Sequence, residues 1–205
     1  MKNFFAHLIS IILIPLLVPV YLFYILLFFF PGLTPIFSFH DKVGAVVGIF
    51  IATSLLPFVL VWVLFKKGLI SSLTLDNKKD RVIPQLFSCF NYFIISVLLF
   101  YYSGNNGLTL SMIASTLSLI VLTIITPYWK ISAHASGALG IFSIATVLYL
   151  KYPNDLFTIP YSIILFMTIA VCMARLHLKV HTPMQILAGC FLGGTIGSLL
   201  FYFFI

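Results

Sequence analysis

The sequence predicts an all-α protein that crosses a membrane about six to seven times as a polytopic helical bundle. Of its 205 residues, 62% are hydrophobic and only 7% are charged, and the mean hydropathy is +1.19. A soluble domain carries charge on roughly a quarter of its residues. The apolar stretches are continuous rather than alternating, which favours helices over the strands of a membrane barrel. We therefore expect a single integral-membrane domain over residues 1–205.

Seven apolar segments are separated by short polar stretches. Their approximate bounds are Phe4–Phe30, Val43–Phe65, Leu86–Tyr102, Leu108–Thr126, a fifth that begins within residues 127–137 and ends near Leu150, Ile159–Ala174, and Pro183 to the C-terminus. Pro15 and Pro19 lie inside the first segment and predict a kink, whose freed carbonyls can be satisfied by neighbouring helices. The first segment is too long for the apolar region of a secretory signal, so we interpret it as a retained span.

Three polar stretches interrupt this pattern, around Arg81, around His134 and from Arg175 to Gln185. They follow the second, fourth and sixth segments. Connections that are two spans apart lie on the same side of the membrane, so all three are expected on one side. Charge is costly at membrane depth, which makes ionisable groups in such places functional candidates.

The residue types in these stretches suit an anion. Arginines such as Arg81 and Arg175 grip phosphate in a bidentate way. Ser132 and the N–H groups that begin the fifth segment add further donors, and histidines supply nucleophilic and acid–base chemistry without a metal or other cofactor. A binuclear metal site would need clustered carboxylates, whereas the chain has only four acids, Asp41, Asp76, Asp80 and Asp155.

Spacing assigns roles within the third stretch. Thr182 is a good N-cap for the seventh segment and Pro183 suits its first turn. His181 then lies at the mouth of that helix, and Gln185 follows four residues later. The side-chain carbonyl of Gln185 can accept from one ring nitrogen of His181, which leaves the other nitrogen available for attack.

Together the three stretches resemble the motifs of the type 2 phosphatidic acid phosphatase/haloperoxidase superfamily, in its membrane-bound lipid phosphatase branch. The family motifs are K-x6-R-P, P-S-G-H and S-R-x5-H-x3-D. The spacing of Arg175, His181 and Gln185 matches the third motif, Ile131–His134 matches the second at Ser and His, and Lys78–Pro84 resembles the first. The order of the motifs also agrees.

This resemblance covers a motif-bearing core of about residues 66–200 and implies a role for each matching position. His181 is the expected nucleophile, which forms a phosphohistidine, and His134 protonates the leaving lipid oxygen. Gln185 orients His181 from the position of the family's Asp. The groups implied in phosphate binding are Arg81, Arg175, Ser132, the backbone N–H of Ala133, Lys78 and Lys79.

Five positions depart from the family pattern, and one of them is Val82, which follows Arg81 where the family has Pro, with the proline delayed to Pro84. Gln185 can orient His181 but cannot offset the positive charge that develops on its ring. Thr74 stands seven residues before Arg81, where the family has Lys, so that Lys78 or Lys79 must substitute. The other two departures are Ala133 in place of Gly and Ala174 in place of Ser.

The resemblance implies hydrolysis of a phosphate or diphosphate monoester of a membrane lipid, such as phosphatidate or a polyprenyl diphosphate. It also implies a multi-pass protein of a bacterial inner membrane. Two alternatives stay open: a non-catalytic protein that binds phospholipid headgroups, and a small-solute transporter. The side of the membrane that the site faces is also open.

Two further features bear on partners. The net charge of +7 does not indicate nucleic acid, because the cations lie mostly at the ends of apolar segments. Gly189, Gly193 and Gly197 recur every four residues in the last segment, a spacing that predicts close helix packing. That packing is expected either within the chain or between the subunits of an oligomer.

Overall fold

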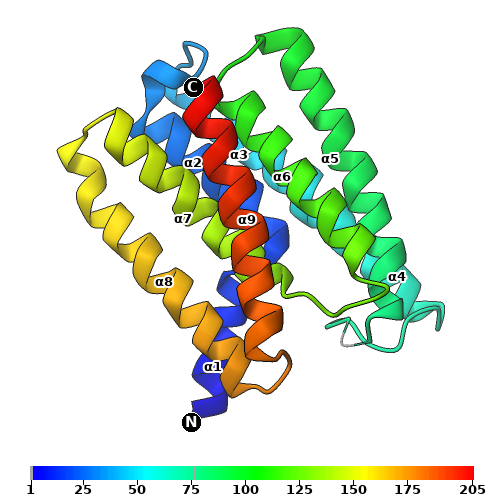
Figure 1. Ribbon diagram of the computed structural model, residues 1–205. Helices are drawn as coiled ribbons and strands as arrows, with labels where there is room; N and C mark the ends of the chain where they lie inside the picture. Colours follow the sequence, from blue (N-terminus) through cyan, green and yellow to red (C-terminus); the bar gives the residue numbers. More distant parts are fainter. Residues whose placement is uncertain (1, 76) are drawn as a thin grey trace.

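The computed structural model describes residues 2–75 and 77–205, so Asp76 lies outside the described residues. The regular structure of the described residues is entirely helical (Figure 1). The α-helices, in chain order, are α1 (Lys2–Ile12), α2 (Val18–Phe29), α3 (Phe39–Phe50), α4 (Leu56–Lys66), α5 (Val82–Ser103), α6 (Gly107–Ile125), α7 (Ala133–Lys151), α8 (Thr158–His177) and α9 (Pro183–Phe204).

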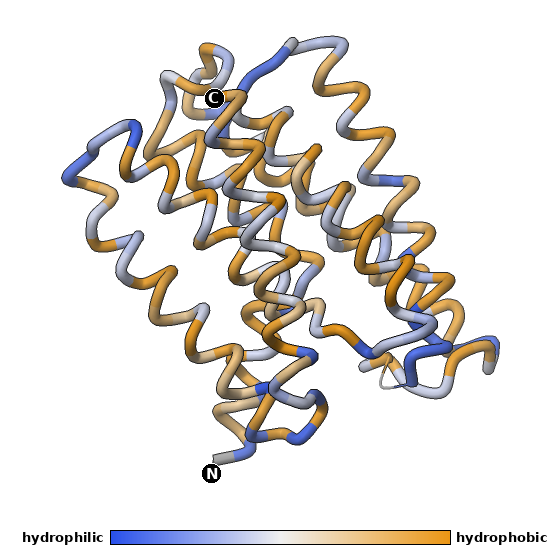
Figure 2. The backbone as a smooth tube through the Cα atoms, in the orientation of Figure 1, coloured by the Kyte–Doolittle hydropathy of each residue, from blue (hydrophilic) through white to orange (hydrophobic). Residues whose placement is uncertain are grey.

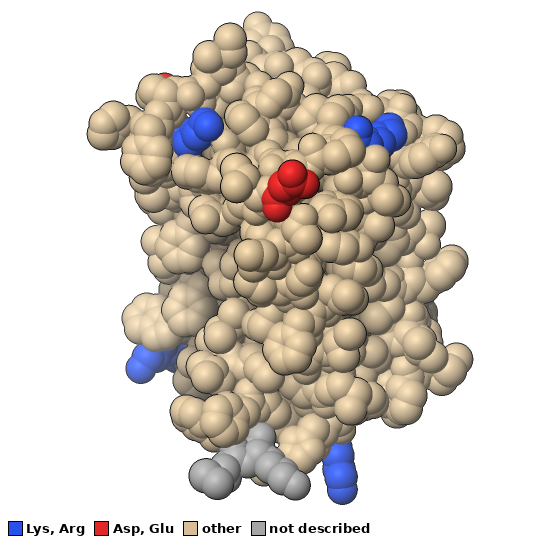
Figure 3. Space-filling view, turned by 90° about the vertical axis from the view of Figure 1, so that its left-hand side faces the viewer, with Lys and Arg blue, Asp and Glu red and all other residues tan. Residues whose placement is uncertain are grey.

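Within the described residues, seven helical stretches are long and apolar enough to cross a membrane, which confirms the predicted bundle. α1 and α2 together form the first of these stretches, and α3 and α4 form the second. Figure 2 shows that the hydrophilic parts of the chain gather at the two ends of the helices. On the face drawn in Figure 3 the charged side chains also lie toward the two ends, with an uncharged belt between them. This distribution is the one that a bilayer requires.

The predicted kink in the first span is a complete break at Pro15. The chain leaves α1, makes a short 3-10 turn and starts α2 in a new direction. Two carbonyls near the break are satisfied by side chains: the Tyr21 hydroxyl donates to the Ile12 carbonyl at 2.6 Å, and the Ser54 hydroxyl donates to the Leu16 carbonyl at 2.8 Å. The break therefore costs little, and it lets α1 pack against α8 while α2 contacts α3, α6 and α7.

The second span begins earlier than expected. Its first helix starts at Phe39 rather than near Val43, because Ser38 and Asp41 form a capping box. The backbone N–H of Asp41 donates to the Ser38 hydroxyl at 3.2 Å, and the Asp41 carboxylate accepts from the Ser38 N–H at 3.0 Å. A π-helical turn over Ile51–Leu55 joins α3 to α4.

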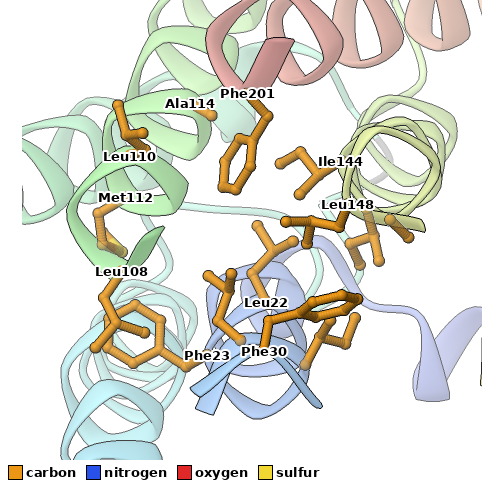
Figure 4. Close-up of a cluster of buried hydrophobic side chains, with 14 of the residues drawn as sticks. Leu22, Phe23, Phe30, Leu108, Leu110, Met112, Ala114, Ile144, Leu148 and Phe201 are labelled. Carbon is orange, nitrogen blue, oxygen red and sulfur yellow. The ribbon is translucent and has the colours of Figure 1, made fainter. Parts of the chain in front are cut away.

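The hydrophobic core lies where α2, α6, α7 and α9 meet (Figure 4). Its largest fully buried side chains include Leu22, Met112, Leu148 and Phe201. α7 and α9 approach each other most closely where a Cβ on Gly193 would overlap the carbonyl oxygen of Ser136. The small residues of the last span thus do pack closely within the chain, and this contact holds the start of α7 against the middle of α9.

Candidate active site

The three polar stretches lie at the same end of the molecule. Figure 1 shows the α4–α5, α6–α7 and α8–α9 connections at the end that also carries the N-terminus, while the C-terminus lies at the other end. The spatial arrangement therefore agrees with the expectation from counting spans. It leaves the question of which side chains actually meet.

His181 is buried in the link between α8 and α9, with only 7% of its surface exposed. Its Nδ1 lies 3.1 Å from the backbone oxygen of Lys130 and 3.3 Å from Oε1 of Gln185. Both partners are carbonyl oxygens, which only accept hydrogen bonds, so Nδ1 carries the hydrogen. Nε2 of the neutral ring therefore holds the lone pair, as a nucleophile at this position requires.

Gln185 joins three parts of the site. Its Oε1 also accepts from the backbone N–H of Thr182 at 3.1 Å, within a capping box that begins α9. Because a backbone N–H can only donate, this contact identifies the atom facing His181 as the oxygen. The backbone oxygen of Gln185 accepts from the Ser132 N–H at 3.1 Å. One residue thus holds the nucleophile candidate and ties the start of α9 to the start of α7.

Ser132 and Ala133 form the beginning of α7. Ser132 is fully buried, and its hydroxyl oxygen caps the helix by accepting from the Ala135 N–H at 3.3 Å. Ser132 can still donate its hydroxyl hydrogen to an anion, and the N–H groups at the start of the helix can donate to it as well. α9 lies close here as well, since a Cβ on Gly189 would overlap the Ser132 carbonyl oxygen.

His134 lies in the first turn of α7 and faces the first span. Its Nε2 is 3.1 Å from the backbone oxygen of Ser10, so Nε2 donates and Nδ1 is the nitrogen that can exchange a proton with a substrate. The charges of Arg175 and Arg81 act on this ring, as does the His181 ring. The two histidines and the two arginines therefore belong to one cluster.

The two arginines reach the cluster from different helices. Arg175 lies in the last turn of α8, which extends to His177 rather than ending near Ala174 as expected, and its Nη1 donates to the Ser10 hydroxyl at 3.3 Å. Arg81 precedes α5, and its Nε donates to the Leu75 carbonyl at 2.7 Å. Each guanidinium carries a permanent charge and can bind phosphate oxygens in a fork.

The pKa of His181 is lowered to about 4. Burial contributes most to this shift, and the positive charges of Arg175 and Arg81 add to it. The hydrogen bonds to Lys130 and Gln185 act in the opposite direction but are weaker. His181 is consequently neutral at physiological pH, in the protonation state that a nucleophile needs.

Lys78 and Lys79 lie beside this cluster. Nζ of Lys78 donates to the Tyr128 carbonyl at 3.4 Å, and the Lys79 side chain is exposed in the turn before α5. Neither charge is among those that act on the two histidine rings. Their role in phosphate binding stays a prediction.

Among the described residues, no three His, Cys, Asp or Glu side chains lie together as a metal site would need. His177, which has no counterpart in the family motifs, is exposed and contacts the Asn3 side chain on α1 at 3.0 Å. The cluster contains two arginines, the N–H groups at the start of α7 and two imidazole rings that can be neutral. That set can bind a phosphoryl group and exchange both an electron pair and a proton with it.

Two contributors were missed from the sequence. Ser10 contacts both His134 and Arg175, although its span carries no motif. The Lys130 carbonyl holds His181, and a backbone atom leaves no trace in a motif. The only signal for Ser10 was a small polar residue inside an apolar run, and such residues more commonly bond their own helix.

The PAP2 superfamily model matches residues 126–205. That range covers α7, α8 and α9, with His134, Arg175 and His181, and it leaves out Arg81. Comparisons with curated proteins and with solved structures found no match.

Proposed function

Because its residues 126–205 belong to the PAP2 superfamily, we propose that this protein is a metal-independent lipid phosphatase. It would hydrolyse a phosphate or diphosphate monoester of a membrane lipid through a phosphohistidine intermediate. The observation that carries this proposal is the tautomer of His181. Two carbonyl acceptors hold its Nδ1–H, so the lone pair of Nε2 is available beside two arginines.

The proposed reaction has two displacements. The cycle starts with His134 protonated at both ring nitrogens once the anionic phosphate is bound. In the first displacement, Nε2 of His181 attacks phosphorus, the bond from phosphorus to the lipid oxygen breaks, and the proton on Nδ1 of His134 passes to that oxygen. In the second, a water molecule loses a proton to His134 and attacks phosphorus, the P–N bond breaks, and inorganic phosphate leaves. Arg81, Arg175 and Ser132 hold the phosphoryl oxygens, since this kind of transfer depends mainly on positioning and positive charge.

An apolar groove supports a lipid as the substrate. The groove has a volume of about 410 Å³ and is lined by residues of the first span, α7 and α8. Ala138 and Ile141 of its wall lie four and seven residues after His134, and Thr168 lies seven residues before Arg175. Residues at these spacings share a helix face, so the groove continues from the cluster toward the middle of the bilayer. A hydrocarbon chain that leaves the site past His134 would lie there.

Phosphate release from a panel of lipid phosphates and polyprenyl diphosphates, with purified protein and chelator present, tests this proposal. We expect release by the wild type and a loss of at least a thousandfold in His181→Ala, because no other group replaces the nucleophile. His40→Ala is the matched control, since His40 is exposed at the start of α3, and the α2–α3 connection lies at the end of the bundle opposite to the site (Figure 1). Equal release by His181→Ala and His40→Ala would refute the mechanism.

A non-catalytic headgroup-binding protein is the second candidate, and Gln185 is the observation that favours it. The side chain that holds His181 is an amide rather than a carboxylate, so Gln185 itself does not offset the charge that develops on the ring during attack. Acid quenching and phosphohistidine detection distinguish the two. A labelled wild type supports the phosphatase, whereas an unlabelled wild type that still binds lipid phosphate supports the binding protein.

A further inference from the structure

Ser10 lies on α1, outside every motif and outside the range that the family model matches. Ser10 is buried, with 6% of its surface exposed. α1 packs against α8, the helix that carries Arg175. The break at Pro15 gives α1 its own direction, which is what brings a residue of the first span to the cluster. Ser10 is therefore placed there by tertiary packing rather than by chain proximity.

Two atoms of Ser10 accept hydrogen bonds from two members of the cluster. The backbone oxygen accepts from Nε2 of His134 at 3.1 Å, and the hydroxyl oxygen accepts from Nη1 of Arg175 at 3.3 Å. A hydroxyl has one hydrogen to donate besides the lone pairs that accept. Among the described residues, no acceptor for that hydrogen is found, so the donor is buried and unused.

An unused buried donor costs free energy and normally has a partner in the working state of the protein. The chemistry of the surroundings selects that partner. Arg175 polarises the hydroxyl by donating to its oxygen, which strengthens the hydroxyl as a donor. An acceptor with negative charge fits this position best, and a phosphoryl oxygen has no hydrogen to compete with the donor.

We propose that Ser10 is a substrate-binding residue whose hydroxyl donates to a phosphoryl oxygen held by Arg175. This inference rests on the proposed function and adds the first span to the site. The contact places Ser10 on the side of the phosphoryl group that faces His134. α1 thereby completes a site whose other members come from the turn before α5, from the start of α7, from α8 and from the α8–α9 link.

Ser10→Ala in the purified full-length protein tests the contact, because it removes the hydroxyl and keeps the backbone oxygen that holds His134. A hydrogen bond to a charged group corresponds to roughly a 10- to 150-fold effect, so we expect kcat/KM for a short-chain lipid phosphate to fall by about that factor. Ser111→Ala is the matched control, since Ser111 is fully buried in α6 and donates to its own helix at Leu108. It should change kcat/KM by less than about twofold.

Ser10→Thr keeps the hydroxyl and should recover most of the activity that Ser10→Ala loses. A purely structural role predicts a different pattern, in which both Ser10 variants lose thermal stability and inhibition by orthophosphate is unchanged. Wild-type kcat/KM in Ser10→Ala, or that structural pattern, overturns the proposal.

Orthophosphate binding separates this inference from the proposed function. The shift in melting temperature with added orthophosphate reports binding whether or not the protein is catalytic. If the wild type releases no phosphate from any lipid, the proposed function fails, yet a shift that is present in Ser111→Ala and lost in Ser10→Ala still supports the Ser10 contact. An equal shift in these two variants overturns it.

Discussion

At the residue scale, the chemistry of the site depends on what Gln185 does for His181. Its carbonyl oxygen accepts from both the His181 ring and the Thr182 N–H. A carboxylate could accept the same two hydrogen bonds and would add a negative charge. Gln185 thus preserves the geometry of the family's acidic residue and omits its electrostatics.

Gln185→Glu, which keeps the size of the side chain, should restore that charge. A carboxylate within a few ångströms raises the pKa of a histidine by roughly 1–3 units, so the pKa of His181 should rise from about 4 toward its ordinary value. Acylation by a reagent that attacks neutral imidazole, read at His181 by peptide mass spectrometry from about pH 3 to about pH 8, measures this shift. In the wild type the reaction should persist down to about pH 4 and fail only below it.

Protonation of His181 removes the Nε2 lone pair, so activity that depends on it is lost as pH falls through the folded-state pKa. The lowered pKa of His181 also makes the free energy of unfolding depend on pH. As pH falls below about 6.5, the unfolded chain takes up this proton before the folded protein does, so the free energy of unfolding declines. If the acylation of wild-type His181 had its midpoint near pH 6.5, this result would contradict the burial of His181 beside two arginines. The Gln185→Leu variant, which lacks any acceptor, provides the reference for loss of orientation.

At the element scale, the site depends on the contact between α7 and α9. Both helix starts carry site residues, and the Ser132 N–H bonds directly to the Gln185 backbone oxygen. A Cβ at Gly189 would clash with the Ser132 backbone, and a backbone atom cannot relieve the clash by changing rotamer as a flexible side chain can. The packing of α7 against α9 and the geometry of the candidate site are therefore coupled at this crossing.

Gly189→Ala should push the two helix starts apart. Overpacking of this kind costs roughly 1–3 kcal/mol of stability, and a shift of about 1 Å at the site can cost about a hundredfold in rate. Gly48→Ala is the control, because a Cβ there has no neighbour within 4 Å. Melting temperature and kcat/KM are the measurements. A Gly189→Ala protein that matches Gly48→Ala in both would contradict the coupling.

At the scale of the whole molecule, the seven spans put all site-bearing connections on one side of the membrane. The opposite side carries the turn between α5 and α6 and the short connection after α7. This arrangement holds whichever compartment the site faces. It requires that the break at Pro15 leaves α1 and α2 as parts of a single span.

Single cysteines at Asn105 and at Lys67, in a cysteine-free background, test this topology. Asn105 is exposed in the α5–α6 turn, and Lys67 is exposed at the end of α4 near the site. A membrane-impermeant maleimide added to sealed vesicles of one orientation should label one of the two positions and leave the other unlabelled until detergent is added. Labelling of both before detergent would mean that a span has been miscounted.

The amino-acid sequence alone determined the membrane bundle, its six to seven spans and, for a count of seven, the common side of the three motif stretches, because hydropathy and span counting depend only on the order of residues along the chain. It also predicted the contact between Gln185 and His181, since four residues at a helix start fix a local geometry. Ser10 and the Lys130 carbonyl could not be predicted in this way. The positions of these two groups in the site depend on how α1 is tilted relative to α2 and on how closely α7 packs against α9. The sequence of an apolar helix does not determine which neighbouring helix its few polar atoms will contact.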